Sequence, residues 1–152
     1  MKKLILLLIT IALSIGLIAC NSSTQDSLKD SKSVVENHFI YQNEKNKDKL
    51  LTTLTNHYKQ GNTDWELDNL GSIKIVNINE ELNEGIRNNY LRNVRGSINN
   101  ITSKNLKVYK VDYEVKYKRD GIGPQDSGTY EWWYFLIREN ENSPWLIDDF
   151  GV

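Results

Sequence analysis

The chain has 152 residues, a length typical of a single domain. Its 19 basic and 20 acidic side chains give a net charge of −1, so it lacks the positive excess of a typical nucleic-acid-binding protein. It contains one cysteine, Cys20, which excludes a disulfide bond within the chain.

The N-terminus has the pattern of a secretory signal. Lys2 and Lys3 precede an apolar run over residues 4–19, which is short for a membrane-spanning helix of about 20 residues. The run ends in Leu17-Ile18-Ala19-Cys20, which resembles the lipobox of bacterial lipoproteins. The resemblance implies cleavage before Cys20 and attachment of diacylglycerol to its sulfur. Acyl chains such as palmitate would then anchor the protein at the extracytoplasmic face of the cell membrane. The alternative is an ordinary cleaved signal followed by a chance cysteine.

Cleavage at this point changes the charge of the chain and defines its parts. It removes two lysines, which leaves 17 basic and 20 acidic side chains and a net charge of −3, so we expect no nucleic-acid partner. The residues that follow are polar and cannot bury enough apolar surface to order themselves. We therefore predict a signal peptide over 1–19, lipidated Cys20 with a flexible tether over 20–31, and one domain over 32–152.

Two helices are predicted at the start of the domain. Ser33-Val34-Val35-Glu36 has the pattern of a capping box, in which the Ser33 side chain accepts from the Glu36 amide, and predicts a helix from Ser33 to Asn43 or Asn46. Apolar residues three and four apart give it one buried face. A second helix begins near Asn46 with Leu50, Leu51 and Leu54 directed inward, and residues 57–62 end it in a loop.

The middle of the chain has weaker patterns. Residues 65–79 predict one or two strands with a break at Gly71-Ser72, after which Ile73–Ile78 alternates imperfectly. Residues 80–95 place apolar side chains at helical spacing and predict a short helix. Residues 96–105 are polar and predict a loop.

The last third of the chain predicts three long antiparallel strands. Leu106–Lys118 alternates strictly, with Tyr109, Val111, Tyr113, Val115 and Tyr117 on the buried face. Thr129–Arg138 is apolar on both faces and therefore needs cover on both, which predicts a central strand. A turn-rich segment over 119–128 joins these two strands as a hairpin, and a second hairpin leads into Pro144–Asp149.

This order of elements predicts an α+β fold, in which N-terminal helices pack on one face of a curved antiparallel sheet. The order resembles the cone-shaped nuclear-transport-factor-2-like (cystatin-like) fold, and Trp145-Leu146-Ile147-Asp148-Asp149 is similar to the Trp-x-Ile-x-Asp ending of such domains. With the lipobox, the chain resembles an uncharacterised lipoprotein family of Gram-positive bacteria that carries a domain of unknown function. The resemblance spans Ser33 to Val152 and implies no catalytic residue.

Enzymes with this fold use an Asp, Glu or His in the cone as a general base, so such residues are candidates. For each we favour a structural role: Asp112 and Glu114 on the wet face of their strand, Glu131 at an exposed strand end, and His38 and His57 as packed or capping groups. For Asp148 and Asp149 we also favour a structural role, the capping of backbone amides near the C-terminus; the alternative is that one of them points into the cone and acts in acid–base chemistry. Two histidines without nearby acids or cysteines do not predict a metal site, and no motif predicts a cofactor.

The aromatic residues are the other candidate signal, because they exceed what a small core needs. We predict that a pocket, if the cone is open, lies near Tyr113, Trp132, Trp133 and Tyr134. Arg87, Arg92 and Arg95 are interpreted as a solvated face rather than an anion site. Three hypotheses follow: a non-catalytic domain that binds a small molecule or an envelope protein, an acid–base enzyme, and a module that forms a homodimer through its sheet.

Overall fold

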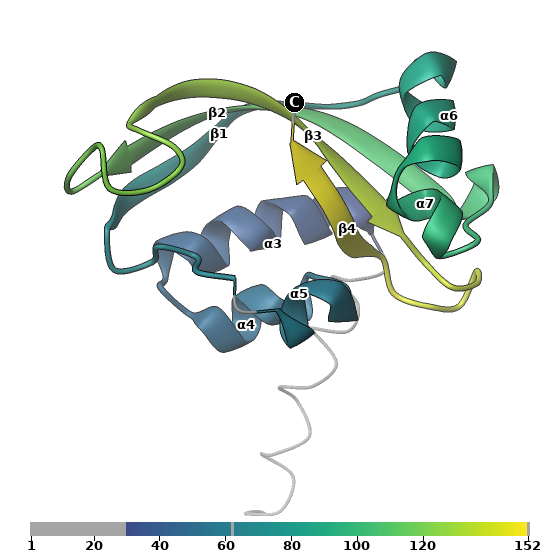
Figure 1. The fold of residues 1–152 in the computed structure, drawn as a ribbon, viewed down its shortest axis with the longest axis horizontal. Helices are drawn as coiled ribbons and strands as arrows, with labels where there is room; N and C mark the ends of the chain where they lie inside the picture. The colour runs from purple at the N-terminus through teal and green to yellow at the C-terminus, as the bar shows by residue number, and fades with distance from the viewer. Residues whose placement is uncertain (1–29, 62, 152) are drawn as a thin grey trace, which may run out of the picture.

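A computed structural model describes residues 30–61 and 63–151, which form a curved four-stranded sheet with helices on both faces (Figure 1). The strands are β1 (Leu70–Glu80), β2 (Leu106–Tyr117), β3 (Gly128–Ile137) and β4 (Leu146–Gly151). The helices are α3 (Ser31–Asn43), α4 (Lys47–Thr52), α5 (Asn56–Gln60), α6 (Glu84–Asn93) and α7 (Arg95–Ile98), with a short 3-10 turn at Ser103–Asn105. The predicted α+β class is confirmed.

The sheet has the order β1-β2-β3-β4, and every neighbouring pair is antiparallel. It arches over α3, α4 and α5 without closing into a barrel (Figure 1). The predicted signal peptide, Cys20 and most of the predicted tether lie outside the described residues. Within 30–61 and 63–151, no helix is both long and apolar enough to cross a bilayer.

Helix α3 begins earlier than the capping-box pattern predicts. Asp30 is its N-cap, and the Asp30 carboxylate accepts from the amides of Lys32 and Ser33. The Ser33 hydroxyl also donates to Asp30, which lowers the pKa of that carboxyl. Ser31, predicted to be part of the tether, is instead buried, with its hydroxyl 2.8 Å from that of Tyr109.

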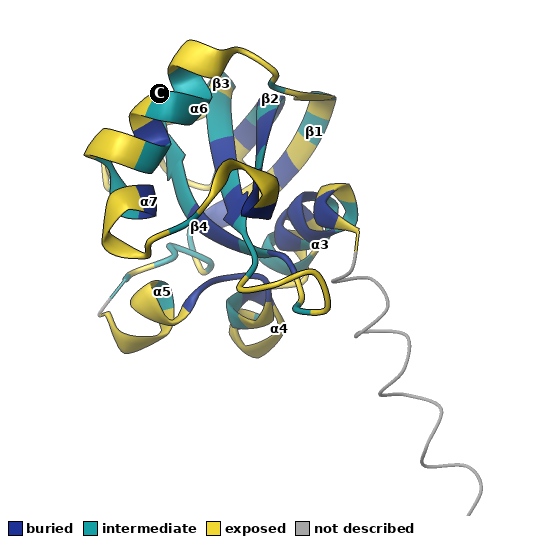
Figure 2. Cartoon of the chain, turned by 90° about the vertical axis from the view of Figure 1, so that its right-hand side faces the viewer, coloured by how far each residue is buried: buried dark blue, intermediate teal, exposed yellow. Residues whose placement is uncertain are grey.

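The concave face of the sheet forms the main core with α3 and α4. Val34, Val35 and Phe39 of α3 pack against the predicted inner face of β2, where Val111 and Tyr113 are almost fully buried. Burying one such side chain contributes about 1.5–3 kcal/mol. The alternation seen in the sequence of β2 is therefore confirmed, and its buried residues form dark bands across the strands in Figure 2.

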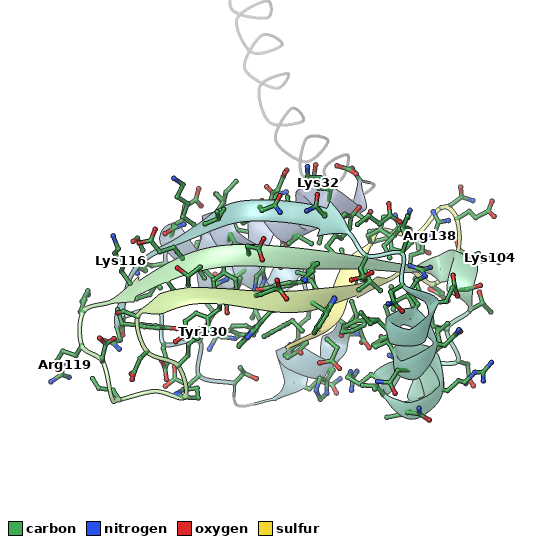
Figure 3. The ribbon with its side chains drawn as sticks, turned by 90° about the horizontal axis from the view of Figure 1, so that it is seen from above. Lys32, Lys104, Lys116, Arg119, Tyr130 and Arg138 are labelled. Carbon is green, nitrogen blue, oxygen red and sulfur yellow. The ribbon has the colours of Figure 1, made fainter. Side chains whose placement is uncertain are left out.

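The opposite face of the sheet is covered at one end by α6. The prediction that helices pack on one face only is therefore wrong. Tyr90 of α6 stacks on Phe135 of β3 with ring centroids 4.6 Å apart. Leu106 and Val108 are also buried there. Figure 3 views the molecule from above, with α6 beside one end of the strands and Arg119 at the tip of the β2–β3 hairpin at the other end. The prediction that β3 is covered on both faces is confirmed.

Three local predictions are wrong. The predicted loop after α4 contains helix α5, and the predicted polar loop over 96–105 contains α7 and the 3-10 turn. The break predicted at Gly71-Ser72 is a bulge within one continuous strand, β1. A Cβ at Gly71 would lie 2.8 Å from the Lys116 carbonyl oxygen, so this glycine marks a close approach of two strands rather than a strand end.

Both outer edges of the sheet are partly paired. At the edge of β1, the side-chain amide of Asn43 accepts from the Ile73 N–H (2.9 Å) and donates to the Ile73 carbonyl (2.6 Å), as a neighbouring strand would. At the edge of β4, the Ile147 N–H donates to the Thr53 carbonyl and the Thr55 N–H donates to the Ile147 carbonyl, both at 2.9 Å. The end of α3 and the segment between α4 and α5 therefore shield the two edges.

Candidate functional site

A cavity of about 170 Å³ lies between the concave face of the sheet, the end of α3 and two loops. Helix α3 contributes His38 and Gln42, and the α5–β1 loop contributes residues 63–66. The β2–β3 loop contributes Pro124 and Gln125. The strands contribute Ile73, Tyr113, Tyr117, Trp132, Tyr134 and Phe150. Six of the fourteen lining residues are Phe, Trp or Tyr.

Phe150 of β4 is the centre of the aromatic cluster. Its ring stacks within 20° of parallel on Tyr134 (5.5 Å between centroids) and on Trp132 (6.0 Å). Tyr58 of α5 stacks on it as well, at 5.3 Å. Offset-stacked rings at these separations stabilise a protein by more than the burial of their apolar surface alone. The cluster therefore gives the cavity flat and rigid walls.

His38 has one defined tautomer in this cluster. The Thr53 hydroxyl has a single hydrogen, which it donates to the Leu50 carbonyl at 2.7 Å. In the contact of 3.1 Å between His38 Nδ1 and Thr53 Oγ1, the donor is therefore Nδ1–H. His38 Nε2 then carries a lone pair, and within residues 30–61 and 63–151 no group donates to it. Burial lowers the pKa of His38 to about 3, so the ring is neutral at physiological pH.

The Tyr134 hydroxyl is the second polar group at the cavity. Tyr134 is only 3% exposed, and its hydroxyl forms no hydrogen bond with any residue that the structure describes. Burial raises the pKa of Tyr134 well above its ordinary value, so the hydroxyl keeps its proton. Tyr113 differs, because its hydroxyl accepts from the Gln125 side chain at 2.9 Å. Burial raises the pKa of Tyr113 to about 12.

Asp148 is the centre of a separate buried network at the end of β4. It is fully buried, and its Oδ1 accepts from the Thr55 hydroxyl (2.9 Å) and from Arg95 Nη2 (3.2 Å). Its Oδ2 accepts from the Tyr90 hydroxyl (2.7 Å), Asn99 Nδ2 (2.9 Å) and Arg95 Nε (3.2 Å). Five donors satisfy the carboxylate, so Asp148 joins α5, α6 and α7 to the sheet and has no free lone pair for chemistry.

Comparison of the sequence with protein-family models identifies the family of this chain. A family model described as a domain of unknown function, DUF4829, matches residues 32–151. The chain belongs to the DUF4829 family. Comparison with curated proteins and with solved structures gave no match.

Three of the four predicted pocket residues line the cavity of this DUF4829 domain. Tyr113, Trp132 and Tyr134 lie together on the concave face. Trp133 lies on the opposite face, where its Nε1–H donates to Glu81 at 3.1 Å and Lys110 approaches its ring. Alternation along β3 separates Trp133 from its two neighbours, so it does not contribute to this cavity.

Phe150 was not predicted at the cavity, because a bulge reverses the alternation of β4. Residues 135 and 136 of β3 are consecutive, but they pair with Asp149 and Ile147, so Asp148 is an extra residue in β4. A regular strand would place Asp149 on the same face as Ile147. With the bulge, Phe150 takes that face, and neither aspartate lines the cavity.

The other candidate residues lie in surface or structural positions. Lys110 pairs with Glu131 at 2.8 Å, and Lys116 pairs with Glu114 at 3.1 Å, on the outer face of the sheet. Asp112 accepts from Asn77 on the same face. Asp112 and Glu114 lie on the wet face that the alternation of β2 predicts, whereas Glu131 is exposed as predicted but lies within β3 rather than at its end.

The arginines and the remaining histidine have separate environments. Arg87 donates through Nη2 to the carbonyls of Ser103 and Leu106, and its Nη1 is buried without a partner among the described residues. Arg95 holds Asp148. The prediction of a solvated arginine face is therefore wrong for Arg87 and Arg95. Arg92 and His57 are exposed. No cluster of three His, Cys, Asp or Glu side chains that could hold a metal occurs in the described ranges.

A larger hollow of about 460 Å³ lies beside Asp148, between α5, α7 and the β3–β4 hairpin. Its cationic groups are already engaged, because Arg95 pairs with Asp148 and Arg138 donates to Asn105 and stacks on Trp145. The concave cavity differs, since the His38 and Tyr134 groups that face it lack partners among the described residues. We therefore take the concave cavity as the candidate site.

Proposed function

We propose that this DUF4829 domain binds a small molecule in the cavity between α3 and the concave face of the sheet. The observation that carries the proposal is a pair of polar groups in a cavity rich in aromatic side chains, His38 Nε2 and the Tyr134 hydroxyl, which form no hydrogen bond with any described residue. A ligand that hydrogen-bonds to both groups is oriented by the two contacts. Helices on the concave face of a curved antiparallel sheet support assignment to the nuclear-transport-factor-2-like class.

The proposed role is binding rather than catalysis. A general base works best when its pKa lies near the working pH, and the pKa of about 3 makes His38 a weak base. Asp148 is saturated by donors and lies outside the cavity. The carboxylates that line the cavity, Asp64 and Glu66, belong to the α5–β1 loop and are not buried. These features favour a binding domain over the alternative of an acid–base enzyme.

Native mass spectrometry of residues 21–152, purified without denaturant, tests the proposal. We expect a retained mass above that of the chain, and identification of that mass would name the ligand. A Gln42→Trp variant is the control, because a large side chain at this lining position should displace the ligand. A bare monomer for the unmodified chain would contradict the proposal, and a bare dimer would favour pairing through the sheet.

We also propose that Cys20 carries the lipid that holds the domain at the extracytoplasmic face of the cell membrane. The expected result is that the unmodified protein stays in the membrane fraction and incorporates labelled palmitate, whereas a Cys20→Ser variant loses the label and leaves that fraction. Two acyl chains are enough for stable anchoring, so the difference should be large. Retention of Cys20→Ser with the membranes would contradict the proposal.

A further inference from the structure

We propose that the ligand is an uncharged compound with a single aromatic ring and at least one hydroxyl group, and that this hydroxyl donates a hydrogen bond to His38 Nε2. The inference rests on the proposed binding function and adds the chemical class of the ligand. It follows from three features of the cavity: the direction of the available hydrogen bonds, the absence of buried charge, and the size and flatness of the walls.

The direction of the hydrogen bond at His38 requires a donor on the ligand. Nδ1–H is engaged by Thr53, whose own hydrogen is donated to the Leu50 carbonyl. Nε2 is therefore an acceptor only, and a ligand carbonyl or ether oxygen leaves it unpaired. A ligand hydroxyl satisfies it. The Tyr134 hydroxyl can donate or accept, so it pairs with an oxygen of the same ligand.

The charge of the cavity disfavours an ionic ligand. His38 and Tyr134 are both neutral at physiological pH, and no charged side chain that lines the cavity is buried. A carboxylate placed beside His38 and Tyr134 would lose its hydration without gaining an opposite charge, and an ammonium group there would reach only the solvent-accessible carboxylates of Asp64 and Glu66 in the α5–β1 loop. A neutral hydroxyl loses much less hydration free energy, and its hydrogen bonds to the protein offset that loss.

The size and shape of the cavity fit one ring. A volume of about 170 Å³ is close to that of cavities of roughly 150 Å³ that take up benzene. The rings of Trp132 and Phe150 lie within 20° of parallel, and Phe150 also stacks on Tyr134. Flat walls of this kind favour a planar ligand that can stack or pack edge to face. A fused two-ring compound would have to extend out of the open side of the cavity.

Calorimetric titration of the complete mature chain with three probes tests the inference. The probes are phenol, toluene and benzoate, which share one ring and differ in the hydroxyl and in charge. We expect phenol to bind roughly tenfold more tightly than toluene, as one neutral hydrogen bond allows, and benzoate to show no binding. Equal affinity for phenol and toluene, or preferred binding of benzoate, would overturn the inference.

Two variants that keep an aromatic ring identify the groups that contact the ligand. His38→Phe removes both ring nitrogens, and Tyr134→Phe removes the hydroxyl, so each should weaken phenol binding several-fold and leave toluene binding unchanged. Trp133→Phe, on the opposite face of the sheet, is the matched control and should change neither. Unchanged phenol affinity in His38→Phe would overturn the assigned hydrogen bond.

The outcomes also separate this inference from the binding function on which it rests. If native mass spectrometry finds a retained compound but phenol does not bind, the ligand class is wrong and the binding function stands. If no compound is retained and none of the probes binds, both proposals fail together.

Discussion

Replacing Asp148 by asparagine is expected to lower the free energy of unfolding by about 3–5 kcal/mol, the usual loss when one partner of a buried ion pair is removed. Asp148 is fully buried, and the Arg95 guanidinium is 3.2 Å from it. An asparagine NH₂ would replace one acceptor oxygen and face donors from Tyr90, Asn99 or Thr55. The charge of Arg95 would then be partly buried without an opposite charge.

Asp149 provides the matched control, because it is adjacent in sequence but differently placed. Burial raises the pKa of its carboxyl, so the folded state disfavours the ionised form at neutral pH. Removing that charge in Asp149→Asn should therefore leave stability unchanged or slightly increased. Urea denaturation of both variants at pH 7 measures the difference. Similar losses in the two would show that the donors around Asp148 do not stabilise the fold.

Acidification is expected to destabilise the protein through His38 before most carboxylates titrate. The pKa of His38 falls from 6.5 to about 3 on folding, so the unfolded chain binds the proton more tightly. The stability that neutral His38 contributes is complete above pH 6.5 and is lost progressively as the pH falls toward 3. At pH 5 the loss is about 2 kcal/mol, from 1.36 kcal/mol for each pH unit below 6.5.

The test of this pH dependence is a comparison of the unmodified protein with His38→Phe. Denaturant unfolding at pH 7.5 and at pH 5 should show a drop for the unmodified protein that is about 2 kcal/mol larger than the drop for the variant. The carboxylates contribute equally to both, so they cancel in the difference. Parallel drops would mean that His38 takes up a proton in the folded protein as readily as in the unfolded chain.

The sequence predicts the parts of the fold in which one periodicity dominates. The strict alternation of β2 identifies its buried face. The apolar residues on both faces of β3 correctly predict that other elements cover both faces. The cap of α3 was missed because Asp30 and Ser33 are both good cap residues, and the pattern alone does not rank them. Helix α5 is five residues long and gives too few turns for a periodic signal.

The candidate site is harder to predict because it depends on contacts between distant residues. The cluster at the cavity needs Phe150 on the concave face, and this depends on the bulge at Asp148. The bulge places the Asp148 side chain among donors that lie 49 to 93 residues away in sequence. No local pattern in residues 145–150 contains that information, so simple alternation assigns the wrong faces to the end of β4.

The shielded edges of the sheet bear on self-association. An open edge strand can pair with the same strand of another molecule, which is the first step toward aggregation. The Asn43 amide occupies the ladder position at Ile73, and the backbone at Thr53 and Thr55 occupies the positions at Ile147. On a membrane surface, where we propose that the lipid on Cys20 holds the domain, this pairing disfavours edge-to-edge association of neighbouring copies at these positions.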